Sequence, residues 1–347
     1  MLIDWNTDAV ILALLGGSLI SLATILNLLF MGRVTGISGM VFTVVKLNTR
    51  EGLFWKISFL LGLVSAVLFF KNFVGDAIWN IKIFDGKEAE LGITMNEWII
   101  GSLLVGIGTQ WGNGCTSGHA VCGIPRLSPR SIIATLIFMF FGVVTATLKQ
   151  NKPFQREEFI LEPKMFEIIV KVSQLIFITL YGVYFFAVFI YSISSRPIKN
   201  KFEPVFSFII GNVFGSGLVL AGMCRRTKIL GFLALKDGWD PSLLFVMGAA
   251  VGINLIAFNI VLREPKPLMI EKWSVPTRKD IDVGVIVGPA LFGVGWGITG
   301  MCPGPAVTNL VLLPQAILMV IFIGIGQVTI RAILDAYPPA ADKVHKG

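Results

Sequence analysis

Charged residues are scarce in this 347-residue chain, where Asp, Glu, Lys and Arg together make up only 14% of the composition. Apolar residues make up 54%, and the mean hydropathy is +0.79. A soluble protein of this length cannot bury so much apolar surface. The composition therefore excludes a soluble enzyme and indicates a membrane protein.

Histidine and cysteine are also rare, with two and four residues respectively. No Cys-x-x-Cys pair occurs, so a metal centre has too few ligands, and we expect no metal and no other cofactor. A Walker-type phosphate loop is absent, which argues against ATP hydrolysis within the chain. We do not expect a disulfide between Cys115 and Cys122, because about two helical turns separate two such residues by roughly 10 Å.

The apolar residues form runs about as long as a bilayer-spanning helix, which needs roughly 20 residues. There are nine runs, at residues 9–30, 52–70, 97–111, 131–148, 165–192, 205–222, 241–262, 282–298 and 309–333. The first lacks a basic leader and a convincing cleavage site, so we expect it to be a retained helix. The sequence predicts an all-α polytopic membrane protein with a single transmembrane domain over residues 1–347.

The net charge of +8 is carried by short loops between the runs. Loops after the first, fifth and seventh runs are basic, and the loop after the second is acidic. Because basic loops stay on the inner side of a membrane, we expect the N-terminus outside and the C-terminus inside. Basic residues in short loops between spans set the orientation of the protein in the membrane. The positive net charge therefore does not indicate a nucleic-acid partner.

One basic cluster does not follow this rule, because Arg225, Arg226 and Lys228 follow the sixth run and fall on the predicted outer side. Fixed positive charge there would attract an anion into an outward vestibule. The alternative is either a misplaced span boundary or an ordinary cluster that faces lipid headgroups.

Three apolar stretches break off at a cysteine where a membrane helix should continue, at Cys115, Cys224 and Cys302. Irregular backbone at membrane depth needs protein or a water-filled cavity to satisfy its polar groups, so these breaks indicate a pore or substrate site. A buried cysteine in a span can also be a small apolar filler, and polar residues at a break can simply satisfy backbone. The candidate substrate contacts in these breaks are Cys115, Cys302, Cys224, Asn113, Gly114, Thr116 and Gly300.

The glycine spacing before Cys115 is repeated before Cys302. Gly101, Gly106 and Gly108 match Gly288, Gly293 and Gly295 at one constant offset, and Arg33, Thr35, Ile37 and Gly39 match Arg225, Thr227, Ile229 and Gly231 at a similar one. We interpret residues 1–150 and 200–335 as two copies. An odd number of spans separates equivalent elements, so the copies have inverted topology and bring short re-entrant helices together near the midplane.

The string Gly114-Cys115-Thr116-Ser117-Gly118-His119, with the residues 122–131 that follow it and the motif at residues 300–305, resembles the YeeE/YedE sulfur-transport family. The resemblance implies an hourglass-shaped inner-membrane importer of thiosulfate, with Cys115 and Cys302 in its second and fourth repeated loops and Cys224 in its third. It also implies a small cytosolic sulfur-carrier partner of the TusA type. The first loop departs from the pattern, because residues 31–36 contain no cysteine.

A thiol suits such an anion for a physical reason. Thiosulfate is a dianion with a polarizable terminal sulfur, and a cysteine S–H is a soft, weak donor. The thiols should stay protonated, because two unit negative charges 4 Å apart repel by about 4 kcal/mol at an effective dielectric of 20. Weak successive contacts of this kind favour conduction over tight binding.

Three further residues follow the second break. His119 either contacts the substrate or is held by a neighbouring carbonyl group. Arg126 and Arg130 either anchor the chain at the interface or line an inner vestibule that receives the anion. Two other classes of protein stay open: a membrane-embedded thiol redox or sulfurtransfer enzyme, and a noncatalytic scaffold of a larger complex. The host membrane is a cell inner membrane or that of an organelle.

Overall fold

The computed structural model describes residues 3–49, 52–85, 92–150 and 198–337, with a few further positions between 171 and 182. The predicted span at residues 165–192 lies outside these continuous ranges. A long helix is present at each of the other eight predicted spans. These helices are α1 (Thr7–Met31), α3 (Leu53–Phe69), α4 (Met95–Trp111), α5 (Pro129–Gln150), α7 (Ile198–Leu220), α9 (Ser242–Val261), α10 (Val283–Thr299) and α12 (Pro314–Ala336).

Several of these helices are long and apolar enough to cross a bilayer. Six of them in the described part of the chain meet that test, and α10 forms a seventh span if it is counted with the helix that follows it after a 45° bend. Helix α4, at 17 residues, is shorter than a typical span. A polytopic helical protein is therefore confirmed, whereas the count of nine spans stays a prediction.

A short helical segment follows every second long helix. These segments are α2 (Ile37–Val45), the π-helical η4 (Ser117–Gly123), α8 (Arg226–Leu233) and α11 (Pro303–Thr308). The smaller elements are η2 (Phe70–Val74), the antiparallel hairpin of β1 (Ala77–Ile78) and β2 (Ile81–Lys82), and the single turns η5 (Ile124–Arg126) and η6 (Asn309–Val311).

A residue in the left-handed backbone region lies just past each long helix that precedes a short segment. Gly32, Asn113, Gly222 and Gly300 have φ values of +61°, +59°, +68° and +70°. Glycine has no Cβ to clash in this region, and asparagine tolerates it better than most residues. These four positions therefore end α1, α4, α7 and α10 and turn the chain inward, and the first break occurs in the loop without a cysteine.

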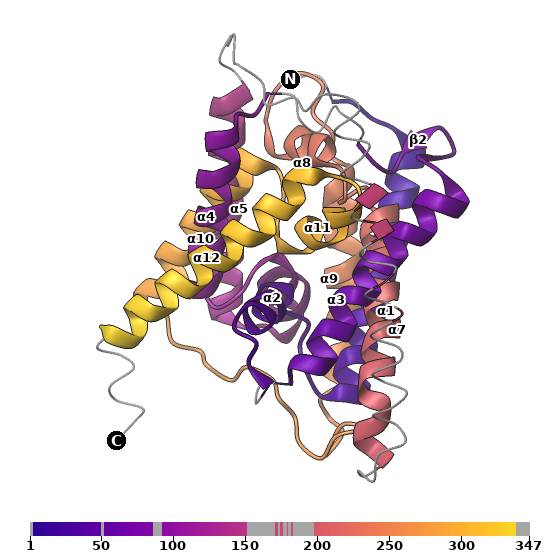
Figure 1. The fold of residues 1–347 in the computed structure, drawn as a ribbon, viewed down its shortest axis with the longest axis vertical. Helices are drawn as coiled ribbons and strands as arrows, with labels where there is room; N and C mark the ends of the chain where they lie inside the picture. The colour runs from indigo at the N-terminus through magenta and orange to yellow at the C-terminus, as the bar shows by residue number, and fades with distance from the viewer. Residues whose placement is uncertain are drawn as a thin grey trace.

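The long helices form two groups of four (Figure 1). Helix α7 packs on α1 and α3, and α1 also packs on α9, while α10 packs on α4 and α5, and α4 also packs on α12. The short segments lie between the groups, since α2 contacts α3, α4 and α12, and α8 contacts α5, α9 and α10. The middle of the molecule is thus built from the segments that follow the breaks.

The packing is unchanged when the two halves of the chain are exchanged. The exchange pairs α1 with α7, α3 with α9, α4 with α10 and α5 with α12. It converts the α3–α7 contact into the α9–α1 contact, and the α5–α10 contact into the α12–α4 contact. The same exchange turns the contacts of α2 with α3, α4 and α12 into those of α8 with α9, α10 and α5, and the contacts of η4 with α5 and α9 into those of α11 with α12 and α3. The contact of α2 with α11 has no counterpart of similar size. In Figure 1 α2 lies in the lower part of the view and α8 in the upper part.

Glycines allow the long helices to approach closely. A Cβ atom added at Gly62 of α3 would lie 2.2 Å from the Phe208 carbonyl oxygen of α7, and one at Gly211 would lie 2.1 Å from the Phe59 carbonyl oxygen. Small residues at such contacts let backbones pack directly against each other, which is a main source of helix association in membranes.

Replacing Gly211 by Val should therefore lower the stability of the protein, by about 3 kcal/mol, because the side chain must displace helix backbone. The midpoint of thermal unfolding in detergent measures the change. Gly252→Val on α9 is the matched control, because an added Cβ meets no atom within 4 Å there. Equal losses in both variants would contradict the importance of the close contact.

Candidate functional site

Two of the predicted cysteines meet at one small cavity. Cys115 and Cys302 both line a space of about 30 Å³, together with residues of α1, α7, α9 and the short segments α2, η4 and α11. This volume is about that of a single water molecule. Side chains such as Ile20, Phe214 and Leu218 make most of its wall apolar. The breaks from opposite halves of the chain therefore join at a narrow constriction.

Hydroxyl groups contact both thiols of this cavity. The Cys115 Sγ atom lies 3.3 Å from the Ser117 Oγ atom, and the Thr116 hydroxyl donates to the Cys302 Sγ atom at 3.5 Å. Ser117 Oγ also accepts a hydrogen bond of 3.2 Å from the backbone amide of Ile37, and Ile37 is the first residue of α2. The constriction thus contains weak donors and a helix N-terminus around two sulfur atoms.

The other two cysteines lie elsewhere. Cys224 Sγ is 3.4 Å from the Thr308 hydroxyl, and its backbone carbonyl accepts from Asn309 Nδ2 at 2.9 Å. Cys122 Sγ donates to the Thr35 carbonyl oxygen at 3.7 Å. All four cysteines are free thiols, in agreement with the expectation that Cys115 and Cys122 are not joined.

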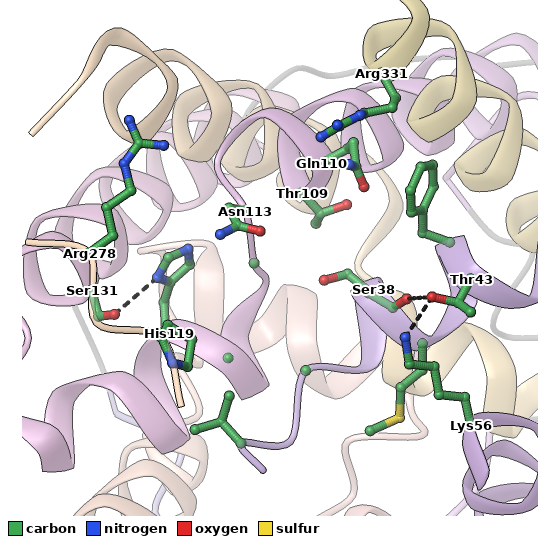
Figure 2. A pocket seen from close by; sticks show the side chains of 18 of the residues that line it. Ser38, Thr43, Lys56, Thr109, Gln110, Asn113, His119, Ser131, Arg278 and Arg331 are labelled. Carbon is green, nitrogen blue, oxygen red and sulfur yellow. Dashed lines mark hydrogen bonds between the residues drawn. The ribbon is translucent and has the colours of Figure 1, made fainter. Parts of the chain in front are cut away.

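A larger cavity of about 530 Å³ opens beside the constriction. Asn113, Gly114 and His119 line it on one side, and residues of α2, α3 and α12 line it on the other (Figure 2). We call this cavity the basic vestibule, because its lining holds six cationic side chains and one acidic one: Lys46, Lys56, Arg126, Arg130, Arg278 and Arg331, with Asp335. Cys224 and Gly300 line neither this vestibule nor the constriction.

Both ring nitrogens of His119 have partners. Nε2 lies 3.1 Å from the Gly112 carbonyl oxygen, and Nδ1 lies 3.2 Å from the Ser131 hydroxyl. A carbonyl oxygen can only accept, so Nε2 carries the proton, and Nδ1 of the neutral ring accepts from Ser131. His119 therefore ties the end of α4 to α5 while one face of its ring borders the vestibule.

The charge of Arg130 is balanced by carboxylates. Arg130 Nη1 lies 2.9 Å from Asp282 Oδ2 and 3.9 Å from Asp280 Oδ2, and its side chain is buried. Partial burial raises the pKa of Asp282, but hydrogen bonds from Arg130 and the Val285 amide, with the charges of Arg130 and Arg278, hold that pKa below its ordinary value. Arg130 thus holds the loop before α10 in place.

The basic cluster after α7 is divided between two environments. Arg225 pairs with Asp85 at 3.0 Å and lines a third cavity, of about 180 Å³, with Lys82, Lys228, Asp4 and Asp240. Arg226 does not line this cavity. It is buried, donates from Nε to the Thr299 carbonyl oxygen at 2.8 Å, and lies 5.6 Å from the centre of the Trp98 ring. The cavity at this end therefore carries nearly balanced charge.

Sequence reasoning did not select three residues of the constriction. Ser117 bridges Cys115 and α2, and the thioether side chains of Met223 and Met247 line the cavity beside the thiols. Ser117 belongs to the conspicuous string after Gly114, which is a usable signal. Met223 directly precedes Cys224 as Met301 precedes Cys302, whereas Met247 lies within α9 and has no signal of its own.

The ion pair of Arg130 and Asp282 should stabilise the protein only above acidic pH. Asp282→Asn keeps an N-cap side chain for α10 but removes the charge, and should cost about 2 kcal/mol at pH 7. Because the folded pKa is lowered, this difference is present above about pH 4, the unfolded value for Asp, and vanishes as the pH falls through the folded pKa.

Thermal unfolding of both forms between pH 8 and pH 3 measures the effect. Asp335→Asn is the control, since Asp335 pairs with Arg331 on the same helix with both side chains about half exposed. A stability loss that persists unchanged at pH 3 would contradict the ion pair.

Known proteins resemble both halves of the chain. Residues 2–145 match a family model described as sulphur transport, and residues 203–339 match a family of unknown function, DUF6691. A probable transporter of Xylella fastidiosa strain 9a5c is 43% identical over 101 residues, which cover 29% of this chain and 69% of that protein. A probable transporter of strain Temecula1 is 42% identical over 135 residues, which cover 39% of this chain and 90% of that protein. The chain therefore belongs to the YeeE/YedE family of sulphur-transport membrane proteins.

Proposed function

We propose that this protein carries thiosulfate, or a closely related sulfur anion, across the membrane through the constriction that Cys115 and Cys302 line. The main support is that these two thiols, 187 residues apart in sequence, border one cavity directly beside the basic vestibule. Family membership and the relatives described as probable transporters support transport as the general activity.

The lining of the constriction suits a soft anion. Its apolar wall removes water from whatever passes, and a dianion loses much hydration energy in doing so. The Thr116 and Ser117 hydroxyls, the N-terminus of α2 and the two thiols offer weak donors that offset part of this loss. At about 30 Å³ the cavity is too small for thiosulfate, so the constriction would have to widen during transport.

Transport fits these contacts better than thiol catalysis does. A nucleophilic cysteine needs a base beside it that takes up the proton of the thiol. The described partners of Cys115 and Cys302 are hydroxyl groups and, for Cys302, the Gly304 backbone, and His119 directs its nitrogens to Gly112 and Ser131. Protonated thiols in noncovalent contact with the anion are consistent with this arrangement.

We propose further that residues 1–150 and 200–335 are inverted repeats that form an hourglass. The exchangeable packing of the two halves supports this, as does the placement of α2 and α8 in opposite parts of the molecule (Figure 1). The four short segments would then be re-entrant helices, with α2 and η4 entering from one face and α8 and α11 from the other.

On this topology the basic vestibule faces the cytosol and the N-terminus lies outside. The positive-inside rule supports the assignment, because the vestibule is lined by Lys46 and Arg278, which lie in loops, and by Lys56 in the first turn of α3. A small sulfur carrier of the TusA type would accept the anion on the cytosolic side, a partner proposed from the family resemblance alone. A bacterial inner membrane is the expected location.

Uptake of radiolabelled thiosulfate into proteoliposomes should fall about tenfold in Cys115→Ala and in Cys302→Ala, which corresponds to about 1.4 kcal/mol in the barrier. The physical reason is the loss of a soft donor at the narrowest point. Cys122→Ala should leave uptake unchanged, because its thiol points to the Thr35 carbonyl outside the constriction. Full activity in the Cys115 and Cys302 variants would eliminate the proposed thiol contacts.

Orientation can be tested with single cysteines introduced into a cysteine-free variant. A membrane-impermeant maleimide should label Asn80→Cys, in the exposed β1–β2 turn, in intact cells. It should label Lys279→Cys, in the exposed loop before α10, only after permeabilisation. The opposite pattern would reverse the assignment of the vestibule to the cytosol without affecting the proposed constriction.

A further inference from the structure

The lining of the basic vestibule contains an arginine, Arg126, whose guanidinium has N–H groups without a hydrogen-bond partner. Arg126 ends η5, the turn that joins η4 to α5, and Leu127 follows it in the left-handed region with φ +53°. Its side chain lines the vestibule with Gly114, Gly118 and His119. It is therefore close to the point at which the break containing Cys115 enters the constriction.

The Nε and Nη1 atoms of Arg126 are buried and have no hydrogen-bond partner. Buried charged donors almost always have partners in folded proteins, because removing them from water without replacement is costly. Three other arginines of the vestibule each contact a carboxylate. Arg130 pairs with Asp282, Arg278 with Asp280 and Asp282, and Arg331 with Asp335.

The space around Arg126 suits a small anion. Asp335 is the one acidic side chain among the residues that line the vestibule, and it pairs with Arg331. Gly118, Gly36 and Gly39 also line the vestibule, and a Cβ atom added at any of them would meet no atom within 4 Å. The absence of side chains at these three positions leaves this part of the vestibule open, and the Ser128 hydroxyl borders the same space.

We infer that Arg126 forms an oxyanion-binding site in the vestibule, separate from the constriction. A guanidinium presents a planar fork of N–H donors that matches two oxygens of a sulfate-like group. Cys115 and Cys302 would contact the terminal sulfur of thiosulfate, and Arg126 would bind its oxygens after passage. Sulfate, which has the oxygens but no soft sulfur, would therefore occupy this site and compete with thiosulfate without crossing easily. Only the identity of the natural ligand, thiosulfate, rests on the proposed function.

The test is sulfate binding to the purified full-length protein in detergent, measured by isothermal titration at constant ionic strength with chloride as the balancing anion. Arg126→Gln should weaken sulfate binding at least about tenfold, as expected for loss of a charge-assisted contact. Arg331→Gln is the matched control and should bind within about twofold of wild type, because it removes the same charge from another residue of the vestibule lining, one that is paired with Asp335.

Each outcome decides the question. The site would be overturned by unchanged binding in Arg126→Gln or by no binding in the wild type. Equal losses in both variants would also overturn it, because they would indicate a diffuse positive field. If Arg126→Gln does not elute as a folded species, Arg126→Lys replaces it. Lysine keeps the charge but lacks the fork, so binding should still fall about fivefold, and wild-type affinity in this variant would also overturn the site.

A double variant separates this inference from the proposed function. The protein with both Cys115→Ala and Cys302→Ala should retain sulfate binding, because the site lies outside the constriction. Loss of sulfate binding in that variant would contradict two separate sites. Unchanged thiosulfate uptake by the double variant, with sulfate binding still dependent on Arg126, would refute the thiol contacts and leave the vestibule site intact.

Discussion

The structure depends on how the broken helices satisfy their backbone inside the protein. A carbonyl group left without a donor away from water costs about 1–3 kcal/mol. A side chain from elsewhere in the sequence or across the break donates to such a group at each of the four breaks. The donor–acceptor pairs are Asn27 to Arg33, His119 to Gly112, Asn309 to Cys224, and Arg226 to Thr299. These bonds offset the cost of ending helices in the middle of the molecule. They also give His119 and Arg226 a structural role that needs no contact with a substrate.

This constraint also determines where the sulfur atoms lie. Once α4 and α10 end and their backbones are held, the residues that follow are directed toward the space between the two helix groups. On the proposed repeat Cys115 and Cys302 occupy equivalent positions after equivalent helices, and their meeting at one cavity is what such a repeat would produce. Cys224 follows a different break and contacts Thr308 instead. The same fold therefore places two thiols at the constriction and the other two outside it.

The sequence was sufficient for features that depend on local pattern. Apolar runs located eight long helices, and the glycine–cysteine strings located three of the four described breaks, because both follow from short-range sequence and from backbone freedom at residues such as Gly300. Features that depend on distant partners were not predictable. Arg130 resembles an anion-attracting residue until Asp282, 152 residues away, is seen beside it, and Arg226 resembles a vestibule residue until its burial against Thr299 and Trp98 is seen. Thus the sequence located these cations along the chain, but which of them have a charged or buried partner could be learned only from the fold.

The distribution of free charge suggests why passage would have a preferred direction on the proposed path. At one end Arg225 is neutralised by Asp85, and the small cavity there contains acidic and basic groups in similar number. At the other end six cationic side chains line the vestibule and three of them pair with carboxylates, so a positive excess remains that includes Arg126, whose Nε and Nη1 atoms have no hydrogen-bond partner. The electrostatic energy of a dianion therefore falls from the constriction toward the vestibule. Fields of this kind act over about 10 Å at 0.1 M salt. Such a gradient speeds entry into the vestibule but also retains the anion there, so net import requires a process that removes it on that side.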